Sequence, residues 1–291
     1  CASESASVEG EPELAGARAR DELGLVVTTD EPPAPVERHG RHVAVVTVDN
    51  QPRLNAMTRA MMADLARIWD ELERAEYRAI VLTGAGPRAF SAGADISGDL
   101  SAAPETAKVV SHALLKYDTY SKPIVAAVNG DCVGGGVELL LATDVRAAAP
   151  HARFGLPEVK WSIYPFGGAT VKLIQQIGHV HAMDLLLTGR LIDAAEAARL
   201  GLINRVVPAE ALMEWALETA SQIAANSPSA VQAVKRQISA TIADHARARE
   251  AIGAGVKIPV VGVIEPGAER AALATLRQAV LVIGTEATIG S

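Results

Sequence analysis

Short apolar runs alternate with amphipathic stretches in the first half of the chain, and this order predicts an α/β domain. The runs Val43–Val48, Ala79–Thr83 and Ile124–Val128 have the length and composition of buried strands. Residues 57–74 carry apolar side chains at helical spacing, and residues 104–120 are also predicted to be helical.

Strand signals become rare after Gly168, so the second part of the chain is predicted to be mostly helical. Before that point, Val145–Ala148 and Arg153–Gly155 are predicted as short strands. Beyond it, one strand-like piece is Ile203–Val207, and helices are predicted over 171–177, 181–187, 194–200, 209–226 and 230–252.

The first 35 residues differ from the rest, because they are rich in Glu, Ala, Ser and Pro. Prolines 32, 33 and 35 remove backbone donors and fix φ, so the end of this segment cannot hold a helix. We interpret residues 1–35 as a mobile N-terminal arm. A helix over Glu13–Leu23 is the alternative.

Composition narrows the function classes. The 291 residues are 49% apolar but only 3% aromatic, so a core must be built from Ala, Val, Leu and Ile. A net charge of -7 argues weakly against nucleic acid as a partner. The two cysteines make no disulfide framework, and no Cys/His spacing indicates a metal site, so a cytoplasmic protein is expected. No apolar run reaches the length of a membrane span, and no signal-peptide pattern opens the chain.

One stretch, Asn129–Asp144, combines three glycines with a carboxylate. Gly134–Gly136 lie where a buried strand passes through a loop into a helix, so the first backbone N–H groups of that helix have no internal acceptor. Their dipoles favour an anion, and glycine lets a ligand approach closely. Glu138 follows Gly135 by one helical turn and can share its side of the helix. This combination indicates chemistry on a carbonyl that becomes an enolate.

Two further features supply the second half of such a site. Phe90–Asp95 is a loop of small residues after a strand, and its backbone N–H groups can point outward. Two N–H groups from two facing loops form an oxyanion hole, in which each donor is worth about 3–4 kcal/mol. Glu158 follows a short strand, and Pro157 stiffens its approach. Each of these features alone more often has only a structural role. Our hypothesis is that together they form one site that stabilises an enolate.

The segments that carry these features resemble the crotonase superfamily, and most of all its enoyl-CoA hydratases. The likeness runs from about Val36 to about Ile252. It is carried by Phe90–Ile96, Ala126–Leu139 and Phe154–Glu158, with further agreement in Gln51–Met57 and Leu187–Pro208.

The resemblance implies a fold: a spiral of ββα units followed by a helical trimerisation region. It places an α/β core at residues 36–200, a helical C-terminal region at 201–252 and an atypical tail at 253–291. It also implies assembly into a homotrimer or a dimer of trimers.

The resemblance also implies a reaction, the addition of water across the double bond of a trans-2-enoyl-CoA thioester. The N–H groups of Ala94 and Gly135 match the oxyanion hole, and Glu138 and Glu158 match the two glutamates that handle the water. No separate cofactor is expected, because CoA is part of the substrate. Substrate or CoA contacts are expected at Arg53, Ala92, Gly93, Asp95, Ile96, Gly134 and Phe166.

Phe166 departs from the family pattern, because hydratases usually have a glycine just after the proline of this loop. Its ring is expected either to narrow the acyl pocket and move the water, or to pack outward. Trp161 and Tyr164 either line the acyl site or serve the core or a trimer contact. Two other functions therefore stay open: a different crotonase reaction, such as enoyl-CoA isomerisation or acyl-CoA thioester hydrolysis, and non-catalytic acyl-CoA binding.

The remaining residues of note are predicted to have structural rather than catalytic roles. His179 and His181 are predicted in a surface loop, Cys132 as a packing residue and Asp144 as a capping or orienting residue. In the tail, Lys257–Ala268 and Val282–Ile289 resemble part of glutamate racemase. That family's cysteine motifs are absent, so no racemase activity is inferred.

Overall fold

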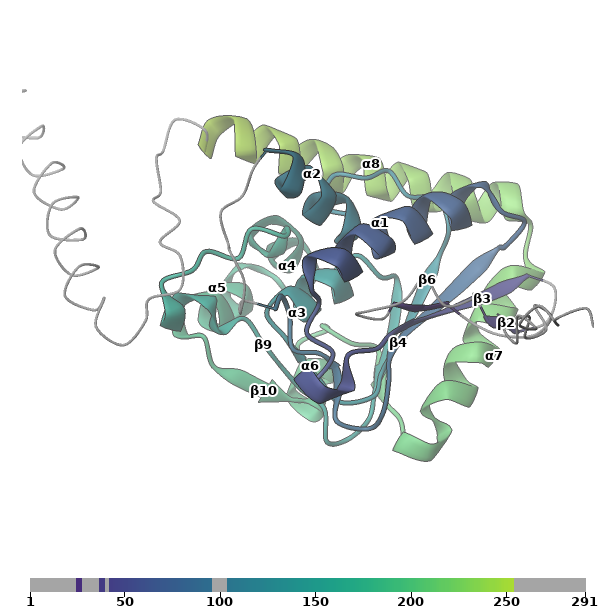
Figure 1. Cartoon of the computed structure of the whole chain (residues 1–291), viewed down its shortest axis with the longest axis horizontal. Coiled ribbons are helices and arrows are strands. Elements are labelled where there is room, and N and C mark those ends of the chain that lie inside the picture. The colour runs from purple at the N-terminus through teal and green to yellow at the C-terminus, as the bar shows by residue number, and fades with distance from the viewer. Residues whose placement is uncertain (1–24, 28–36, 40–41, 96–103, 254–291) are drawn as a thin grey trace, which may run out of the picture.

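A computed structural model describes residues 25–27, 37–39, 42–95 and 104–253 (Figure 1). Its main sheet runs in the order β1-β3-β4-β6-β8-β11, with β2 antiparallel beside β3. The predicted strands Val43–Val48, Ala79–Thr83, Ile124–Val128 and Val145–Ala148 are confirmed. The strands of this sheet are β1 (Leu25–Val27), β2 (Glu37–His39), β3 (Val43–Val48), β4 (Ala79–Gly84), β6 (Ile124–Val128), β8 (Val145–Ala148) and β11 (Arg205–Val206).

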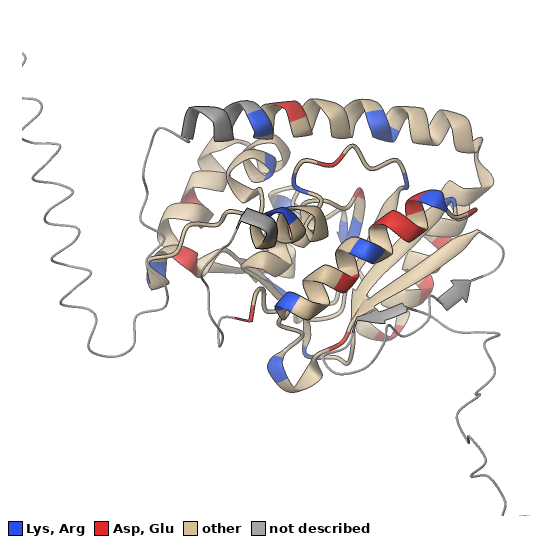
Figure 2. Ribbon diagram, turned by 45° about the horizontal axis from the view of Figure 1, so that its top comes forward, with Lys and Arg blue, Asp and Glu red and all other residues tan. Residues whose placement is uncertain are grey.

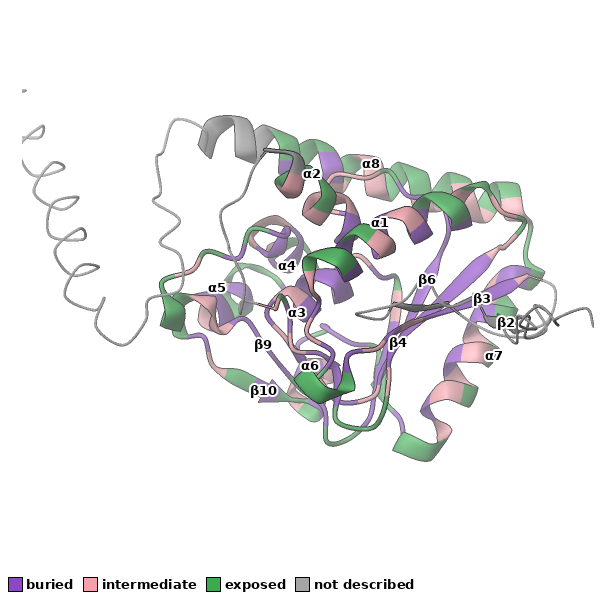
Figure 3. Ribbon diagram, viewed as in Figure 1, coloured by how far each residue is buried: buried purple, intermediate pink, exposed green. Residues whose placement is uncertain are grey.

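Helices cover both faces of this sheet, which is why its central strands are apolar along their whole length. All six residues of β4 are buried. On one face the core includes α1 (Arg59–Arg74), which begins at the N-cap Thr58. On the other face it includes α7 (Leu212–Ala225). Figure 3 shows the buried strands between helices whose outer sides are exposed.

A second, smaller sheet was not predicted as a sheet, and it positions the functional segments. Its order is β10-β9-β7-β5. Strands β5 (Ala89–Ser91), β7 (Asp131–Val133) and β9 (Arg153–Gly155) are mutually parallel, and β10 (Leu191–Asp193) pairs antiparallel with β9. Three parallel strands therefore deliver three loops to one edge.

The later part of the chain is mostly helical, as predicted. Figure 1 shows α8 as a long outer helix, and it packs against α4. Besides α1 and α7, the helices are α2 (Pro104–Ala113), α3 (Gly135–Leu140), α4 (Ala169–Ile177), α5 (His179–Thr188), α6 (Ala194–Arg199) and α8 (Pro228–Gly253), with 3-10 turns η1 (Gln51–Arg53), η2 (Pro157–Trp161) and η3 (Ala209–Ala211).

Two local predictions were wrong in part. His179 and His181 are exposed, as predicted, but they lie in the first turn of α5 rather than in a loop, because Gly178 separates α4 from α5 without a polar cap that would mark a helix start. The helix expected over residues 104–120 ends at Ala113, because Leu115 adopts a left-handed conformation with φ of 46°.

Charges of both signs are mixed along the surface of α1 (Figure 2). Arg67 forms ion pairs with Asp64 and Glu71 one turn to either side. Among the described residues, no helix has both the length and the apolar character needed to cross a membrane.

Several predictions fall largely outside the described residues. Of the expected arm at 1–35, only β1 is described, and it pairs parallel with β3. The alternative helix over Glu13–Leu23, Ile96, and the tail beyond Gly253 all lie outside.

Candidate active site

The three functional segments meet at the carboxyl edge of the small sheet, as the ends of parallel strands do. Ala94 lies just after β5, Gly135 just after β7, and Glu158 just after β9. A Cβ built on Gly135 would lie 3.3 Å from the Ala94 nitrogen, and one built on Gly93 would lie 2.9 Å from the Gly135 nitrogen. The two loops expected to form an oxyanion hole are thus in direct contact.

The backbone N–H groups of Ala94 and Gly135, the two candidate oxyanion donors, take no part in the backbone hydrogen bonding of the described residues. A β-bridge joins Met57 to the loop after β5, but its hydrogen bonds are made by the residues on either side of Ala94. Met57 N donates to Gly93 O at 2.7 Å, and Asp95 N donates to Met57 O at 2.9 Å. Gly135 is the first residue of α3, where an N–H has no acceptor within the helix. Neither N–H finds an acceptor among the described residues.

The glycines of the turn are required by space and by conformation. Gly134 has φ of 56°, which favours glycine. A Cβ on Gly136 would lie 2.3 Å from Ser91 O, so only glycine lets α3 pack this closely on β5. The two loops can therefore approach this closely only because residues 134 and 136 are glycines.

Three polar side chains, for which no role was predicted, hold the loop after β5 in place. Asn55 Nδ2 donates to Ala89 O at 2.7 Å, and Asn129 Nδ2 donates to the same oxygen at 3.0 Å. Ser91 Oγ donates to Asn55 O at 2.8 Å and accepts from Gly93 N at 3.2 Å. Such contacts join residues up to 40 positions apart and leave no periodic signal.

Glu138 is buried in the first turn of α3, with 4% of its surface exposed. Its Oε1 accepts a hydrogen bond from Ala169 N, at the start of α4, at 3.2 Å. The pKa of Glu138 is raised to about 7, mainly by burial and also by the charge of Glu158, against the hydrogen bonds from Ala169 and Gly167 and the charge of Lys116. The carboxyl group can therefore change its protonation state near neutral pH.

Glu158 lies in the first turn of η2, beside the same glycine turn. Its Oε1 is 3.1 Å from where a Cβ of Gly134 would be. Its Oε2 is buried and has no hydrogen-bond partner among the described residues. Burial raises the pKa of Glu158 as well. An unpartnered buried carboxylate oxygen is costly, so it is a strong sign of a functional group.

The burial of Glu138 gives a prediction for stability. The folded protein binds this proton more tightly than the unfolded chain, in which a glutamate titrates near 4.5. Stability from this group is therefore complete below about pH 4.5 and is lost as the pH rises through about 7. Glu138→Gln keeps an acceptor for Ala169 N and is expected to raise the free energy of unfolding by about 3 kcal/mol at pH 8, with little effect at low pH. Urea unfolding at the two pH values measures this, and a difference independent of pH would contradict it.

The residues expected to contact CoA lie around the same loops. Arg53 Nη1 donates to both carboxylate oxygens of Asp95 at 3.0 Å, so these two candidates form an ion pair. Ala92 N donates to Leu54 O at 2.9 Å, which ties the start of this loop to the chain just after η1. Ile96 is outside the described residues.

The aromatic residues of the 161–166 segment do not belong to the core. Exposed fractions are 63% for Trp161, 47% for Tyr164 and 48% for Phe166. Cys132, in contrast, is a free, fully buried thiol whose pKa is raised by burial, which fits a packing role. Asp144 accepts from Ile124 N at 2.8 Å and pairs with Lys235, as expected of an orienting residue.

The fold and this edge of the small sheet define a class: α/β proteins with two outward backbone donors beside one buried and one half-buried carboxyl group, an arrangement suited to enolate chemistry. A sequence model of the family described as enoyl-CoA hydratase/isomerase matches residues 38–256. The chain therefore belongs to the enoyl-CoA hydratase/isomerase family, and its resemblance to the crotonase superfamily is confirmed.

Relatives of known name cover most of the chain. An enoyl-CoA hydratase, EchA19 of Mycobacterium tuberculosis, is 44% identical over 72% of this chain and 81% of its own length. The crystal structure of an enoyl-CoA hydratase from Bacillus anthracis has a TM-score of 0.67 and 33% identity, covering 76% of this chain and 91% of that one. A monofunctional enoyl-CoA isomerase from Mycobacterium smegmatis has a TM-score of 0.61 and 34% identity, covering 71% and 92%. None of these relatives is a racemase.

Proposed function

We propose that this protein hydrates trans-2-enoyl-CoA thioesters. The observation that carries the proposal is the pair formed by buried Glu138 and half-buried Glu158 at one glycine turn, beside two backbone donors that have no acceptor among the described residues. Hydration needs a proton to be taken from water and a proton to be given to the α-carbon, and a pair of carboxyl groups can divide these two transfers. The hydratase from Mycobacterium tuberculosis, at 44% identity, supports the same assignment.

The proposed mechanism assigns one role to each group. The N–H groups of Ala94 and Gly135 bind the thioester oxygen and stabilise the negative charge that develops there. One of the two glutamates removes a proton from water as its oxygen bonds to the β-carbon. The other glutamate donates a proton to the α-carbon, so the elements of water are added without a net change in charge. Neighbouring carboxyl groups hold opposite protonation states more readily than equal ones.

The surrounding loop is proposed to bind the CoA portion, through Ala92, Gly93, Asp95, Ile96 and Gly134, with Arg53 near the phosphates. CoA arrives as part of the substrate, and the proposed reaction uses no separate cofactor or metal. We also propose a cytoplasmic location and assembly into a trimer or a dimer of trimers. The exposed Val234 and Ile238 on α8 support an assembly through the helical region.

The direct test is to incubate the purified protein with crotonyl-CoA and follow the loss of absorbance of the conjugated thioester. Hydration lost on replacing Glu138 and Glu158 supports the proposal. Formation of a 2-enoyl-CoA from a 3-enoyl-CoA, without hydration, would instead indicate an isomerase like the relative from Mycobacterium smegmatis. Acyl-CoA binding in calorimetry with no turnover of any thioester would indicate a binding protein.

We further propose that Phe166 limits the acyl group. The chain has ten aromatic residues, three Phe, three Trp and four Tyr, and the large exposed ones are Trp161, Tyr164 and Phe166. All three lie in the segment that joins Glu158 to Gly167. Gly167, at the end of this segment, lies next to the carboxylate of Glu138. An acyl chain leaving the β-carbon between the two glutamates would meet this segment.

Phe166→Gly is accordingly expected to raise kcat/KM for a long-chain trans-2-enoyl-CoA relative to crotonyl-CoA by about tenfold, because a pocket contact of this size is worth 1–3 kcal/mol. Steady-state kinetics with the two substrates measures the ratio. Val180→Gly, which truncates an exposed side chain on α5, serves as the control and is expected to leave the ratio unchanged. An unchanged ratio in Phe166→Gly would contradict the role.

A further inference from the structure

Lys172, in the second turn of α4, is a buried cation without a carboxylate partner. Only 3% of its surface is exposed, and its Nζ donates to the backbone oxygen of Leu115 at 2.7 Å. It forms no ion pair with a carboxylate among the described residues. Burying an ammonium group is costly unless it is well paired, so a lysine at this position calls for a reason beyond packing.

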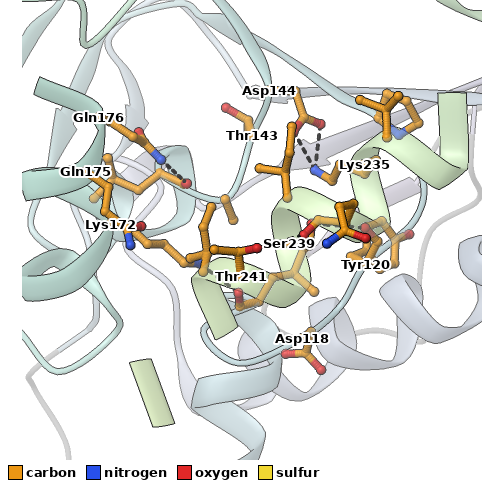
Figure 4. A pocket seen from close by; sticks show the side chains of 18 of the residues that line it. Asp118, Tyr120, Thr143, Asp144, Lys172, Gln175, Gln176, Lys235, Ser239 and Thr241 are labelled. Atoms are coloured by element: carbon orange, nitrogen blue, oxygen red, sulfur yellow. Dashed lines mark hydrogen bonds and ion pairs between the residues drawn. The ribbon is translucent and has the colours of Figure 1, made fainter. Parts of the chain in front are cut away.

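Lys172 forms part of the wall of a cavity of about 1000 Å³ between α4 and α8 (Figure 4). The close-up shows Lys172 entering from the α4 side and Lys235 from α8, where Lys235 pairs with Asp144. Neither Glu138 nor Glu158 lines this cavity. Lys172 therefore lines a cavity that neither proposed catalytic glutamate reaches.

A chain of close contacts links Lys172 to Glu138. The turn that its Nζ holds includes Leu115, whose φ of 46° is unfavourable for a residue with a large side chain. Next to it, Leu114 Cδ1 lies 2.4 Å from the position of a Cβ on Gly167, and Glu138 Oε2 lies 2.4 Å from the same position. Gly167 is thus enclosed between the Leu114 side chain and the carboxylate.

The neighbouring glycine continues the same packing. A Cβ on Gly168 would meet Lys116 Cγ at 3.4 Å and Lys172 Cε at 3.6 Å. Gly168 is the N-cap of α4, and the next residue, Ala169, donates its N–H to Glu138. The aliphatic part of Lys172 therefore supports the turn that presents two hydrogen-bond donors to the carboxylate.

Lys172 and Glu138 also interact through their charges. The pKa of Lys172 is lowered to about 7, first by burial and then by the charge of Lys235, while the charge of Glu138 acts in the opposite direction. Lys172 also faces Lys235 of α8, Arg146 of β8 and Asp118, while Glu138 faces Glu158 of η2 and Lys116. Of the cations, Lys172 is the one that lies on the same helix as a hydrogen-bond donor to Glu138.

We propose that Lys172 is a positioning residue for Glu138: its ammonium group fixes the Leu114–Lys116 turn against Gly167 and supplies the buried positive charge that favours the ionised carboxylate. This role deepens the proposed hydratase function, and its kinetic readout rests on that function. The same geometry also predicts a titration that can be observed without turnover.

The kinetic test compares Lys172→Met with wild type across a pH series of kcat and KM. Loss of the opposite charge is expected to move the acidic limb of kcat upward by about one pH unit, with KM changed less than about twofold. Lys172→Arg is expected to restore most of the shift. Lys122→Met is the matched control, because Lys122 is also buried and its Nζ also donates to backbone oxygens, those of Ala75 and Tyr77.

The second readout is the carboxyl ¹³C NMR titration of Glu138, assigned with Glu138→Gln. Its midpoint is expected to rise in Lys172→Met and to stay in place in Lys122→Met. If Lys172→Met does not fold, Lys172→Gln carries the same prediction. An unmoved midpoint in a folded variant, or an equal shift in Lys122→Met, would overturn the role of Lys172. Absence of hydration in wild type would overturn the proposed function alone, because the NMR titration still decides on Lys172.

Discussion

Replacing Glu158 with glutamine is expected to lower kcat for enoyl-CoA hydration by about 10²–10⁴-fold, the usual contribution of a positioned general acid or base. Glutamine keeps the size and one acceptor oxygen of the side chain but cannot exchange a proton. The effect should be large because Glu158 Oε2 is buried and makes no hydrogen bond among the described residues, so the protein does not use this oxygen for structure. Initial rates over a range of crotonyl-CoA concentrations separate kcat from KM.

Glu138→Gln is expected to cause a loss of similar size, and the double variant is expected to lose little more than either single variant, because the two carboxyl groups act in one step. Glu210→Gln, which changes an exposed glutamate in η3, is the control and should retain full activity. Full activity in Glu138→Ala combined with Glu158→Ala would exclude the two-carboxylate mechanism.

The parts of the fold that could be predicted are those with long, regular patterns. Strands β3, β4 and β6 are continuous apolar runs because helices cover them on both faces, and α1 repeats its apolar side chains every helical turn. Strands β5 and β7 have three residues each, too few to show a period of two. Yet their parallel pairing brings Ala94 and Gly135 together.

The site shows the same division between local and non-local information. Gly134, Gly135 and Glu138 are adjacent in sequence, so their grouping follows from one strand-to-helix passage. The hydrogen bond from Ala169 N to Glu138 joins residues 31 positions apart, and the bond from Lys172 to Leu115 spans 57. In the sequence, Lys172 is an ordinary polar residue of an amphipathic helix. Only the packing of the 114–116 turn over α4 makes it a buried cation.

Removing the N–H group of Ala94 is expected to lower kcat by about 10²–10³-fold. This is the usual loss of rate when one hydrogen-bond donor of an oxyanion hole is removed. Ala94→Pro removes this donor alone. The bridge to Met57 survives, since it uses the N–H groups of Met57 and Asp95 and the oxygens of Gly93 and Met57. Comparing kcat with crotonyl-CoA and the affinity for a saturated acyl-CoA separates loss of transition-state stabilisation from loss of binding.

Ala94→Gly is the matched control, because it keeps the N–H group while changing the same side chain, and it is expected to stay within a few-fold of wild type. Thermal unfolding of both variants tests whether proline has disturbed the loop, which Asn55 and Ser91 hold in place. If Ala94→Pro is folded and hydrates crotonyl-CoA at the wild-type rate, the thioester oxygen does not bind at this N–H group. The reacting carbonyl would then have to lie elsewhere along the edge of the small sheet.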